Sequence, residues 1–436
     1  MSDPVAGRPQ EEAPGGPPAG AGGPSEGAPG GPSEGAPGGP PGGAAGGPLQ
    51  GTVVVELGNL IAAPYAGMLL ADLGARVIKV EPPAGDLGRR FGPFQGGESA
   101  FFMAVNRGKE SVSFDTKSRV ARQVLDNLVR KADVVLHNLR HGAMERLGLG
   151  ESRCRELSPE VIYTTVSAFG STGPYAQRAG VDVIFQGESG MISITGESGD
   201  GPRKTATTIG DYVAATNAAL AVAAALAETP RRGRRVDVSL RDGLMAVQSG
   251  WNAIGLMTGA QPERTGTASV FLAPNQVFEA SDAPFTLGIV SDRHFSLLCD
   301  AIGRPDLAES HPTNAKRMAD RERLTASLTQ VFKTETAEHW VGLLGGAGLP
   351  TGRVLTLAEA FDDPQARLHR MLVEYDHPTA GRVRATGSPI RFDGGPALAG
   401  APPPTLGGHT REVLAEMGVD SGTVEKMIEE GTATAP

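Results

Sequence analysis

The chain has 436 residues, a formal net charge of −9 and an isoelectric point of about 5.5. It is long enough to bury a sizeable core, and its acidity disfavours nucleic acid or an anionic membrane as a partner. Two cysteines, Cys154 and Cys299, lie far apart, which argues against a disulfide framework and a structural zinc site. With no visible signal peptide and no run of 18 apolar residues, we expect a cytoplasmic protein without a membrane segment.

The first 50 residues consist almost entirely of Gly, Pro, Ala, Ser and Glu. The octapeptide GGPSEGAP occurs twice in tandem, at residues 22–29 and 30–37. Such a tract has too few apolar side chains to offset the entropy lost on ordering. Residues 1–50 are therefore predicted to be a disordered tail.

Ordered structure is expected from residue 51. The pattern predicts a strand at 52–57, a helix beginning at Pro64 and continuing to residue 73, and a strand at 76–81. These three elements form one βαβ unit of a parallel sheet. The loop before the helix reads LGNLIAAP and lacks GxGxxG, so it offers a dinucleotide pyrophosphate no glycine cradle.

Strands and helices then alternate. Strands are predicted at 133–136, 161–166 and 236–240, and helices at 120–131, 143–147 and 241–257. This alternation is typical of a doubly wound α/β domain. The second half is less regular: paired strands at 272–279 and 284–289 and helices at 294–302, 321–332 and 336–344 predict a smaller α+β domain. An extended segment at 371–392 and a helix at 412–417 complete the chain.

Residues 205–228 read as a buried helix, because an alanine-rich run without internal Gly or Pro is apolar on nearly every face. Thr207, Thr208 and Gly210 offer cap or turn chemistry at its start. Asp211 follows, where the helix dipole favours an ionised carboxylate. Asp211 is either a nucleophile or an ordinary first-turn aspartate, and the pattern alone favours the ordinary residue.

Other candidate groups are less specific. Asp182 lies 29 residues before Asp211, and two carboxylates on neighbouring loops could divide acid, base and nucleophilic work. Basic residues on loops after strands suit a phosphorylated ligand, although the pattern alone favours solvated surface charge: Arg89, Arg90, Arg107, Lys109, Lys117, Arg140 and Arg146. The eight histidines show no metal-binding spacing and there is no GxSxG motif.

Six segments in order carry a family resemblance. They include LADLGARVIKVEPPAGDLGRR, NRGKESVSFD, ADVVLHNLRHGAMERLGL and LGGHTREVL, and they occupy residues 62–93, 106–115, 132–149, 180–196, 209–226 and 404–418. In these segments the chain resembles the class III (CaiB/BaiF) CoA-transferases, which include formyl-CoA transferase and L-carnitine CoA-transferase. The resemblance implies a Rossmann-like large domain, a smaller α+β domain and an interlocked homodimer.

The resemblance also implies a reaction: transfer of coenzyme A between an acyl-CoA thioester and a small carboxylic acid. The aspartate of the family's GD motif is Asp211, which would form a mixed anhydride and then an aspartyl-CoA thioester, with Asp182 as an assisting group. Coenzyme A is a substrate, and neither a covalent cofactor nor a metal is expected. The family's CoA contacts fall on Ile61, Ala62, Phe114, Lys117, Asn138, Leu139, Arg146 and Leu147.

The implied organisation is a large domain at 51–242, a linker at 243–266, a small domain at 267–370 and an extended linker at 371–402. Residues 403–420 return to the large domain and 421–436 form a tail. The main alternative activity is that of an α-methylacyl-CoA racemase, which carries a proton-transferring His where this chain has Val181; a CoA-ester binder without chemistry is the third. The family's glycine-rich flap is not evident around residues 286–291.

The substrates stay open at this level. Tyr65, Phe185, Tyr212 and Trp251 are candidate walls of an acyl pocket, with ordinary core packing as the alternative for each.

Overall fold

The computed structural model describes residues 47–436. The predicted tail, residues 1–50, therefore lies outside the described residues except for its last four. Those four form a turn that is tied to the large sheet region, since the Leu49 N–H donates to the Leu73 carbonyl at 2.9 Å. Residues 47–50, which were predicted to belong to the disordered tail, are therefore ordered.

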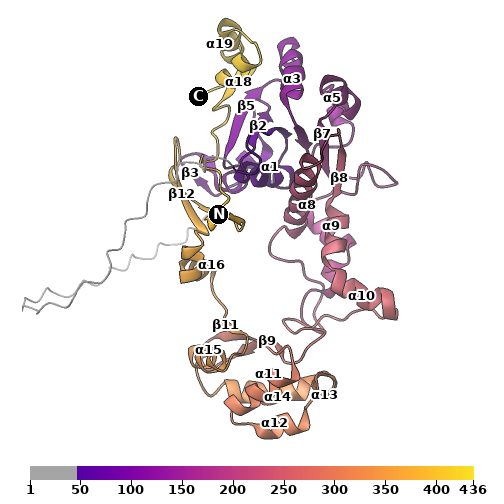
Figure 1. Ribbon diagram of the computed structural model, residues 1–436, viewed down its shortest axis with the longest axis vertical. Coiled ribbons are helices and arrows are strands. Elements are labelled where there is room, and N and C mark those ends of the chain that lie inside the picture. Colours follow the sequence, from indigo (N-terminus) through magenta and orange to yellow (C-terminus); the bar gives the residue numbers. More distant parts are fainter. Residues whose placement is uncertain (1–46) are drawn as a thin grey trace, which may run out of the picture. The chain divides into compact units, whose positions relative to one another are not determined.

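A seven-stranded sheet forms the centre of the larger body, in the order β16-β5-β2-β1-β6-β7-β8 (Figure 1). Its strands are β1 (Val53–Leu57), β2 (Arg76–Glu81), β5 (Lys109–Phe114), β6 (Val134–His137), β7 (Ile162–Ser167), β8 (Arg235–Ser239) and β16 (Ala433–Thr434). Neighbouring strands from β5 to β8 run parallel, and β16 joins β5 antiparallel. The predicted α/β class with a parallel central sheet is confirmed.

Helices cover both faces of this sheet because the strands alternate their side chains between two cores. One core unites Val54 and Val77 with α1 (Ala62–Asp72), α8 (Ile209–Leu226) and α9 (Leu240–Val247). The other unites Val55 and Ile78 with α3 (Arg119–Lys131), α5 (Glu151–Leu157), α18 (Thr410–Glu416) and α19 (Ser421–Glu429). Short elements complete the body: η1 (Leu87–Arg90), β3 (Phe94–Gln95), β4 (Glu98–Ser99), α2 (Ala100–Met103), α4 (Ala143–Arg146), α6 (Asp182–Glu188) and α7 (Met191–Ile194).

The helix predicted at 241–257 is two helices, α9 and α10 (Ser249–Thr258). The break lies at Gln248, whose side-chain amide donates to the carbonyls of Leu244 (2.7 Å) and Ser189 (3.3 Å). This residue ends α9 and ties it to the end of α6. Periodicity extends across such a break, so the sequence pattern merges the two helices.

A smaller body has its own sheet and core. Its antiparallel sheet has the order β11-β10-β9, formed by β9 (Asn275–Glu279), β10 (Pro284–Gly288) and β11 (Thr351–Arg353). The helices are α11 (Asp292–Ala301), α12 (Pro305–Ser310), α13 (Asn314–Ala319), α14 (Arg321–Phe332) and α15 (Ala337–Gly346). Phe278, Phe285 and Trp340 pack around Phe332 in the core, all with edge-to-face geometry against it.

Two short helices, α16 (Leu357–Asp362) and α17 (Pro364–Leu368), lead to the hairpin of β12 (Leu372–His377) and β13 (Gly381–Thr386), and β14 (Arg391–Phe392) pairs with β15 (Gly395–Pro396). A buried ion pair anchors this segment to the large body. Arg107 pairs with Asp72 at 2.5 Å and also donates to the Thr386 carbonyl at 2.8 Å. Asp72 in turn accepts from the Ala399 N–H at 3.0 Å.

Among the described residues, α8 is the one helix whose length and apolar composition would suit a membrane span. Its packing gives that composition a different explanation. Ala214, Ala215, Ala218 and Val222 are fully buried against α1, α9 and the strands β7 and β8. We therefore interpret α8 as a helix with one face in the core. The prediction that it is buried on nearly every side is wrong, because Leu220 on another face is 67% exposed.

Candidate active site

Asp211 lies in the first turn of α8, as predicted, and its side chain is half-buried. Within residues 47–436 no group donates a hydrogen bond to its carboxylate. The favourable effect of the helix dipole on the ionised carboxylate is opposed by two features of its surroundings. Burial, and then the neighbouring negative charge of Asp182, raise the pKa of Asp211 to about 7.

Asp182 begins α6 and lies against the start of α8. One of its carboxylate oxygens accepts from the Gly210 N–H at 2.8 Å and the other from the Gln186 side-chain amide at 2.5 Å. Thr208, predicted to offer a cap, makes no side-chain cap hydrogen bond. Asp182 therefore supplies the capping acceptor that satisfies a free amide of the first turn.

The close approach of Asp182 also explains Gly210. A Cβ at this position would come within 2.9 Å of the Asp182 carboxylate and 3.1 Å of Leu244. Gln186 extends the connection, because its side-chain carbonyl accepts from the Thr205 N–H at 2.9 Å. The segment that enters α8 is thus fixed by α6, and Asp211 is held at a defined place.

Two tyrosine rings pack together near the start of α8. Tyr212 follows Asp211 in α8, and its ring meets the ring of Tyr65 from α1 edge to face at 4.9 Å between centroids. Both are half-buried, whereas Phe185 is fully buried in the core against Phe169 and Trp251 lies on α10. Of the four candidate pocket walls, the structure brings Tyr65 and Tyr212 into contact with each other, and Tyr212 follows Asp211 in α8.

The predicted CoA-contact residues follow the carboxyl ends of β1, β5 and β6, which lie on the same side of the sheet as expected for a ligand site in a parallel α/β fold. The β1 and β6 loops are joined directly. The Asn59 N–H donates to Asn138 Oδ1, and the Asn138 side-chain amide donates to the Asn59 carbonyl, both at 2.9 Å. This reciprocal pair aligns the loop carrying Ile61 and Ala62 with the loop carrying Leu139.

The exposure of these predicted contacts differs. Lys117 and Arg146 are exposed, and Asn138, Leu139 and Leu147 are half-buried. Phe114, Ile61 and Ala62 are buried, and Phe114 belongs to the core beneath α3. These three can therefore offer a ligand mainly backbone atoms.

The predicted basic cluster is divided in the structure. Arg90, Lys117, Arg140 and Arg146 are exposed. Arg107 and Lys109 are buried in ion pairs, and Arg89 pairs with Glu81 at 2.8 Å while lying 3.6 Å over the Phe102 ring. The expectations of ligand-facing or solvated charge are wrong for these three, because carboxylates inside the fold neutralise them.

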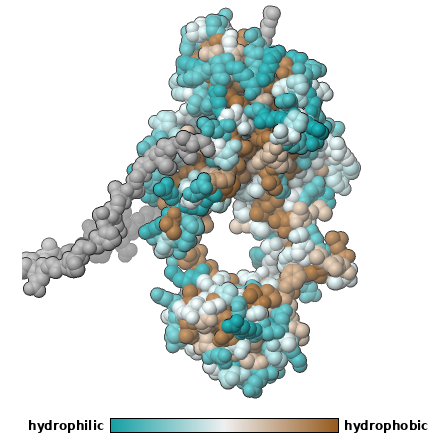
Figure 2. Space-filling view, in the orientation of Figure 1, coloured by the Kyte–Doolittle hydropathy of each residue, from teal (hydrophilic) through white to brown (hydrophobic). Residues whose placement is uncertain are grey.

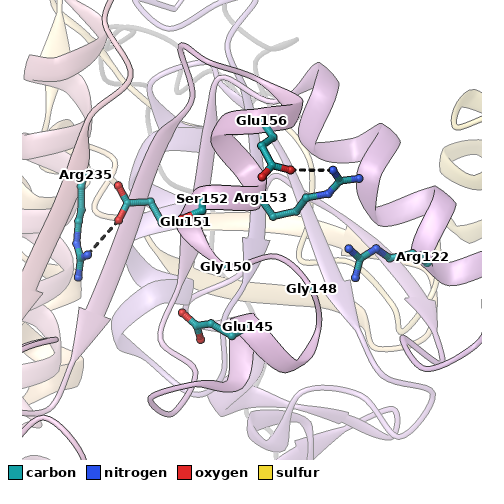
Figure 3. Close-up of a pocket in the computed structure, with 9 residues that line it drawn as sticks. All are labelled: Arg122, Glu145, Gly148, Gly150, Glu151, Ser152, Arg153, Glu156 and Arg235. Carbon is teal, nitrogen blue, oxygen red and sulfur yellow. Dashed lines mark hydrogen bonds and ion pairs between the residues drawn. The ribbon is translucent and has the colours of Figure 1, made fainter.

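A surface depression of about 490 Å³ lies beside the predicted contact Arg146, between α3, α5 and β8 (Figure 3). Four of its charged side chains pair with each other: Glu151 with Arg235 and Arg153 with Glu156, each at 3.0 Å. It offers mixed charge and no apolar wall for an acyl group.

No group of three His, Cys, Asp or Glu side chains that could hold a metal ion is found in the described part of the chain.

The racemase alternative requires a proton-transferring side chain at the position of Val181. Val181 immediately precedes α6 and is 60% exposed, and a valine side chain cannot transfer a proton.

Comparison with known proteins shows the family. Residues 49–410 match the sequence profile of CoA-transferase family III. The chain belongs to this family. It is 37% identical over 351 residues to the acetyl-CoA:oxalate CoA-transferase of Acetobacter aceti, covering 79% of this chain and 89% of that protein. It is also 35% identical over 382 residues to the succinyl-CoA:mesaconate CoA-transferase of Haloarcula marismortui, covering 85% and 96%.

A solved structure supports the same conclusion for the fold. A CaiB/BaiF family protein from Brucella suis superimposes with a TM-score of 0.76 at 34% identity, covering 85% of this chain and 99% of that one. The protein is a CoA-transferase, and the family resemblance seen in the sequence is confirmed.

Sequence reasoning missed one group of residues near this site: Glu56, Lys79 and Asp86 are buried and form ion pairs beneath the β1–α1 loop. A signal was present. Glu56 and Lys79 lie within the apolar strand segments VVVEL and RVIKVE, and charged residues inside buried parallel strands must find partners.

Proposed function

We propose that this CoA-transferase moves coenzyme A between carboxylic acids through covalent intermediates on Asp211. The observation that carries this proposal is the contrast between two adjacent carboxylates. Asp182 has both oxygens occupied by protein donors, whereas Asp211, at the start of α8, has none within the described residues and is partly accessible. An unpaired carboxylate held by a rigid helix start is available for nucleophilic attack.

The steps balance without another reactant. The Asp211 carboxylate attacks the thioester carbonyl, the C–S bond breaks, and CoA leaves as a thiolate, which gives a mixed anhydride. The thiolate then attacks the aspartyl carbonyl, releasing the donor acid and forming an aspartyl-CoA thioester. The acceptor carboxylate attacks this thioester, the C–S bond breaks, and CoA leaves again as a thiolate, which gives a second mixed anhydride. The thiolate then attacks the acceptor's acyl carbon, which releases the new acyl-CoA and regenerates the Asp211 carboxylate.

We place coenzyme A across the loops that follow β1, β5 and β6. Loop backbone around Ile61 and Ala62 and the side chain of Asn138 face this edge of the sheet, and Lys117 and Arg146 provide exposed cations for its phosphate groups. Asp182 acts in this proposal by holding α8 rather than by transferring a proton.

We propose a dicarboxylic acid as the acceptor. Oxalate and mesaconate, which appear in the names of the two relatives, both carry two carboxylates. One carboxylate would enter the reaction with Asp211, and the second would remain as the group that distinguishes acceptors. Tyr212 and Tyr65 are the adjacent aromatic side chains that such an acid would meet first.

We further propose a cytoplasmic homodimer. Figure 2 shows hydrophobic residues gathered over α10, where Leu256 and Met257 are 87% and 84% exposed. Leu220 of α8 is also exposed at 67%. Large apolar side chains with this exposure are typical of surfaces that pair with another chain.

Mass spectrometry tests the covalent step. The protein is incubated with a panel of acyl-CoA donors and trapped with hydroxylamine, and an adduct is expected on Asp211 of the wild type. Asp242→Asn is the matched control, because Asp242 is likewise the third residue of a helix, α9, and should leave the adduct unchanged. Asp211→Asn should abolish it and lower turnover by about a thousandfold or more.

The opposite results are equally clear. An Asp211→Asn variant that keeps its turnover would overturn the nucleophile assignment. Exchange of the thioester's α-proton into solvent without any adduct would instead favour the racemase activity.

A further inference from the structure

Six charged side chains are buried together beneath the loop that connects β1 to α1. Glu56 comes from β1, Lys79 and Glu81 from β2, Asp86 from the segment before η1, Arg89 from η1 and Lys109 from β5. Each side chain is at most 9% exposed. Three positive and three negative charges balance formally, so the cluster can remain ionised inside the fold.

Lys79 and Lys109 connect this cluster to the loop itself. The Lys79 ammonium contacts Glu56 at 2.9 Å and Asp86 at 2.8 Å, and donates to the Gly58 carbonyl at 2.8 Å. The Lys109 ammonium contacts Glu56 at 2.7 Å and donates to the Pro64 carbonyl at 2.6 Å. The two buried lysines therefore bind the backbone at both ends of the β1–α1 loop.

Asp86 holds the middle of the loop. One of its oxygens accepts from the Leu60 N–H at 3.1 Å and from the Gly88 N–H at 2.7 Å, while the other faces Lys79. Leu60 has a φ of +65°, in the left-handed region that a leucine rarely adopts. Such a conformation persists only when surrounding contacts fix it, and the bond from Asp86 is the contact that reaches the Leu60 amide.

The residue between these anchors is held as well. Asn59 exchanges two hydrogen bonds with Asn138, so Gly58, Asn59 and Leu60 are bound by side chains from three other segments. This loop lacks the glycines that let a backbone wrap around a phosphate. Its shape is imposed by side chains elsewhere in the fold.

Buried ion pairs are weak sources of stability, because desolvation offsets much of their attraction. A contribution to the free energy of unfolding is therefore a poor explanation for six buried charges at this position. The hydrogen bonds that the cluster makes to the β1–α1 loop fix the geometry of that loop.

We propose that Asp86 is a positioning residue that, together with Lys79, pre-orders the β1–α1 loop for binding coenzyme A. The proposal rests on the CoA site proposed above. Asp86 does not touch the ligand; it fixes Leu60 in its left-handed conformation, and so places the backbone of Ile61 and Ala62 before the ligand arrives. Loss of this anchor should weaken CoA binding, because only the fraction of molecules with an ordered loop can bind.

Two variants separate loop positioning from capping of η1. Asp86→Ser keeps a hydroxyl that can accept from the Gly88 N–H, but it is too short to reach Leu60 as well. Asp86→Asn keeps the length and an acceptor oxygen for the Leu60 and Gly88 amides, but it puts an NH2 group in place of the oxygen that faces the Lys79 ammonium. Asp420→Ser is the control, since Asp420 caps α19 by accepting from the Thr423 N–H at 3.0 Å and lies outside the proposed site.

Binding of free coenzyme A by calorimetry should weaken about tenfold in Asp86→Ser and less in Asp86→Asn, while the control stays within about threefold of wild type. Steady-state kinetics should show the same change in KM with little change in kcat. Wild-type CoA affinity retained in a folded Asp86→Ser variant would overturn the proposal. Absence of CoA binding in the wild type would instead contradict the proposed function.

Hydrogen exchange supplies a readout that needs neither activity nor a variant. If the loop is pre-ordered, the Leu60 amide of the unliganded wild type is already protected, and adding coenzyme A changes its exchange little. An amide that exchanges like an unstructured one until coenzyme A is added would refute pre-ordering, even where Asp86→Ser failed to fold.

Discussion

Asp211 and Asp182 share one helix start, yet the protein surrounds them differently. The two carboxylate oxygens of Asp182 accept hydrogen bonds from the Gly210 N–H and from the Gln186 side-chain amide. The Asp211 carboxylate accepts no hydrogen bond from the described residues, and its side chain is half-buried. The first and last steps of the proposed cycle change the charge on Asp211, and a nearby carboxylate makes its neutral, acylated forms easier to reach.

The raised pKa of Asp211 predicts the pH dependence of the first step. Attack requires the ionised carboxylate, which forms as the pH rises through about 7. We expect kcat/KM for the acyl-CoA donor to be about tenfold lower at pH 6 than at pH 8 and to level off above the midpoint.

Asp182→Asn removes the neighbouring negative charge, so the midpoint of this profile should move to lower pH, by up to about one unit. Asp242→Asn should leave the midpoint where it is. A profile that is flat from pH 5.5 to pH 8, or an upward shift in Asp182→Asn, would contradict the assignment of the midpoint to Asp211.

At the scale of elements, strongly patterned segments were predictable and those stabilised by distant partners were not. β1, β2, β6 and β7 follow from apolar runs, and α8 from its alanine-rich composition. β5 was missed because KESVSF is half polar, and its Ser111 is buried only because it donates to Glu81 at 2.6 Å. The acceptor for the Gly210 amide was likewise missed, since it comes from Asp182 and not from the adjacent Thr208.

In the predicted site, too, some features follow from the sequence and others depend on contacts between segments that are distant in sequence. The resemblance gave the positions of Asp211 and of the loops around Asn138, and the fold brings these loops to one edge. Whether Arg89 or Lys109 faces a ligand or a buried carboxylate depends on contacts between strands that are distant in sequence. A local pattern of charges carries no information about that choice.

Helix α1 provides a prediction at this scale. Gly67 lies in its interior, where alanine would ordinarily stabilise a helix by about 1 kcal/mol. Here an added Cβ would lie 2.1 Å from the buried Glu56 carboxylate, which Lys79 and Lys109 hold in place. The clash should dominate, so Gly67→Ala is expected to lower the free energy of unfolding by roughly 2–4 kcal/mol, measured by urea denaturation.

Gly342 is the matched control. It lies inside α15, and a Cβ there would meet nothing within 4 Å. Gly342→Ala should therefore be neutral or stabilise the protein by up to about 1 kcal/mol. Equal effects of the two substitutions would show that the Glu56 cluster does not restrict α1.

At the scale of the whole molecule, the chain leaves the large body, builds the smaller one and then returns. Residues after 403 add α18 and α19 to the core that covers α3, and β16 to the exposed edge of β5. The return also reaches the charged cluster: the Gly407 N–H donates to Ser111 at 2.8 Å, and Arg89 donates to the Pro404 carbonyl at 3.2 Å. The last part of the sequence thus supports the loop formed by the first.

This arrangement predicts that the C-terminal segment is needed for folding. Its buried apolar side chains include Val413, Leu414, Met417, Val424 and Met427. Each contributes roughly 1.5–3 kcal/mol, and the sum of roughly 8–15 kcal/mol is as large as the whole stability of an ordinary domain. Deletion of residues 404–436 should therefore yield no soluble, cooperatively unfolding protein, as measured by expression and thermal denaturation.

A shorter deletion separates the core contribution from the added strand. Removal of residues 431–436 eliminates β16 and its pairing with β5 but leaves α18 and α19 in place. This variant should fold, with a free energy of unfolding lower by about 1–2 kcal/mol. It should still bind coenzyme A, since Gly407 and Pro404 remain to hold Ser111 and Arg89. A folded 404–436 deletion with wild-type CoA affinity would mean instead that the β1–α1 loop and its buried charges keep their geometry without the returning segment.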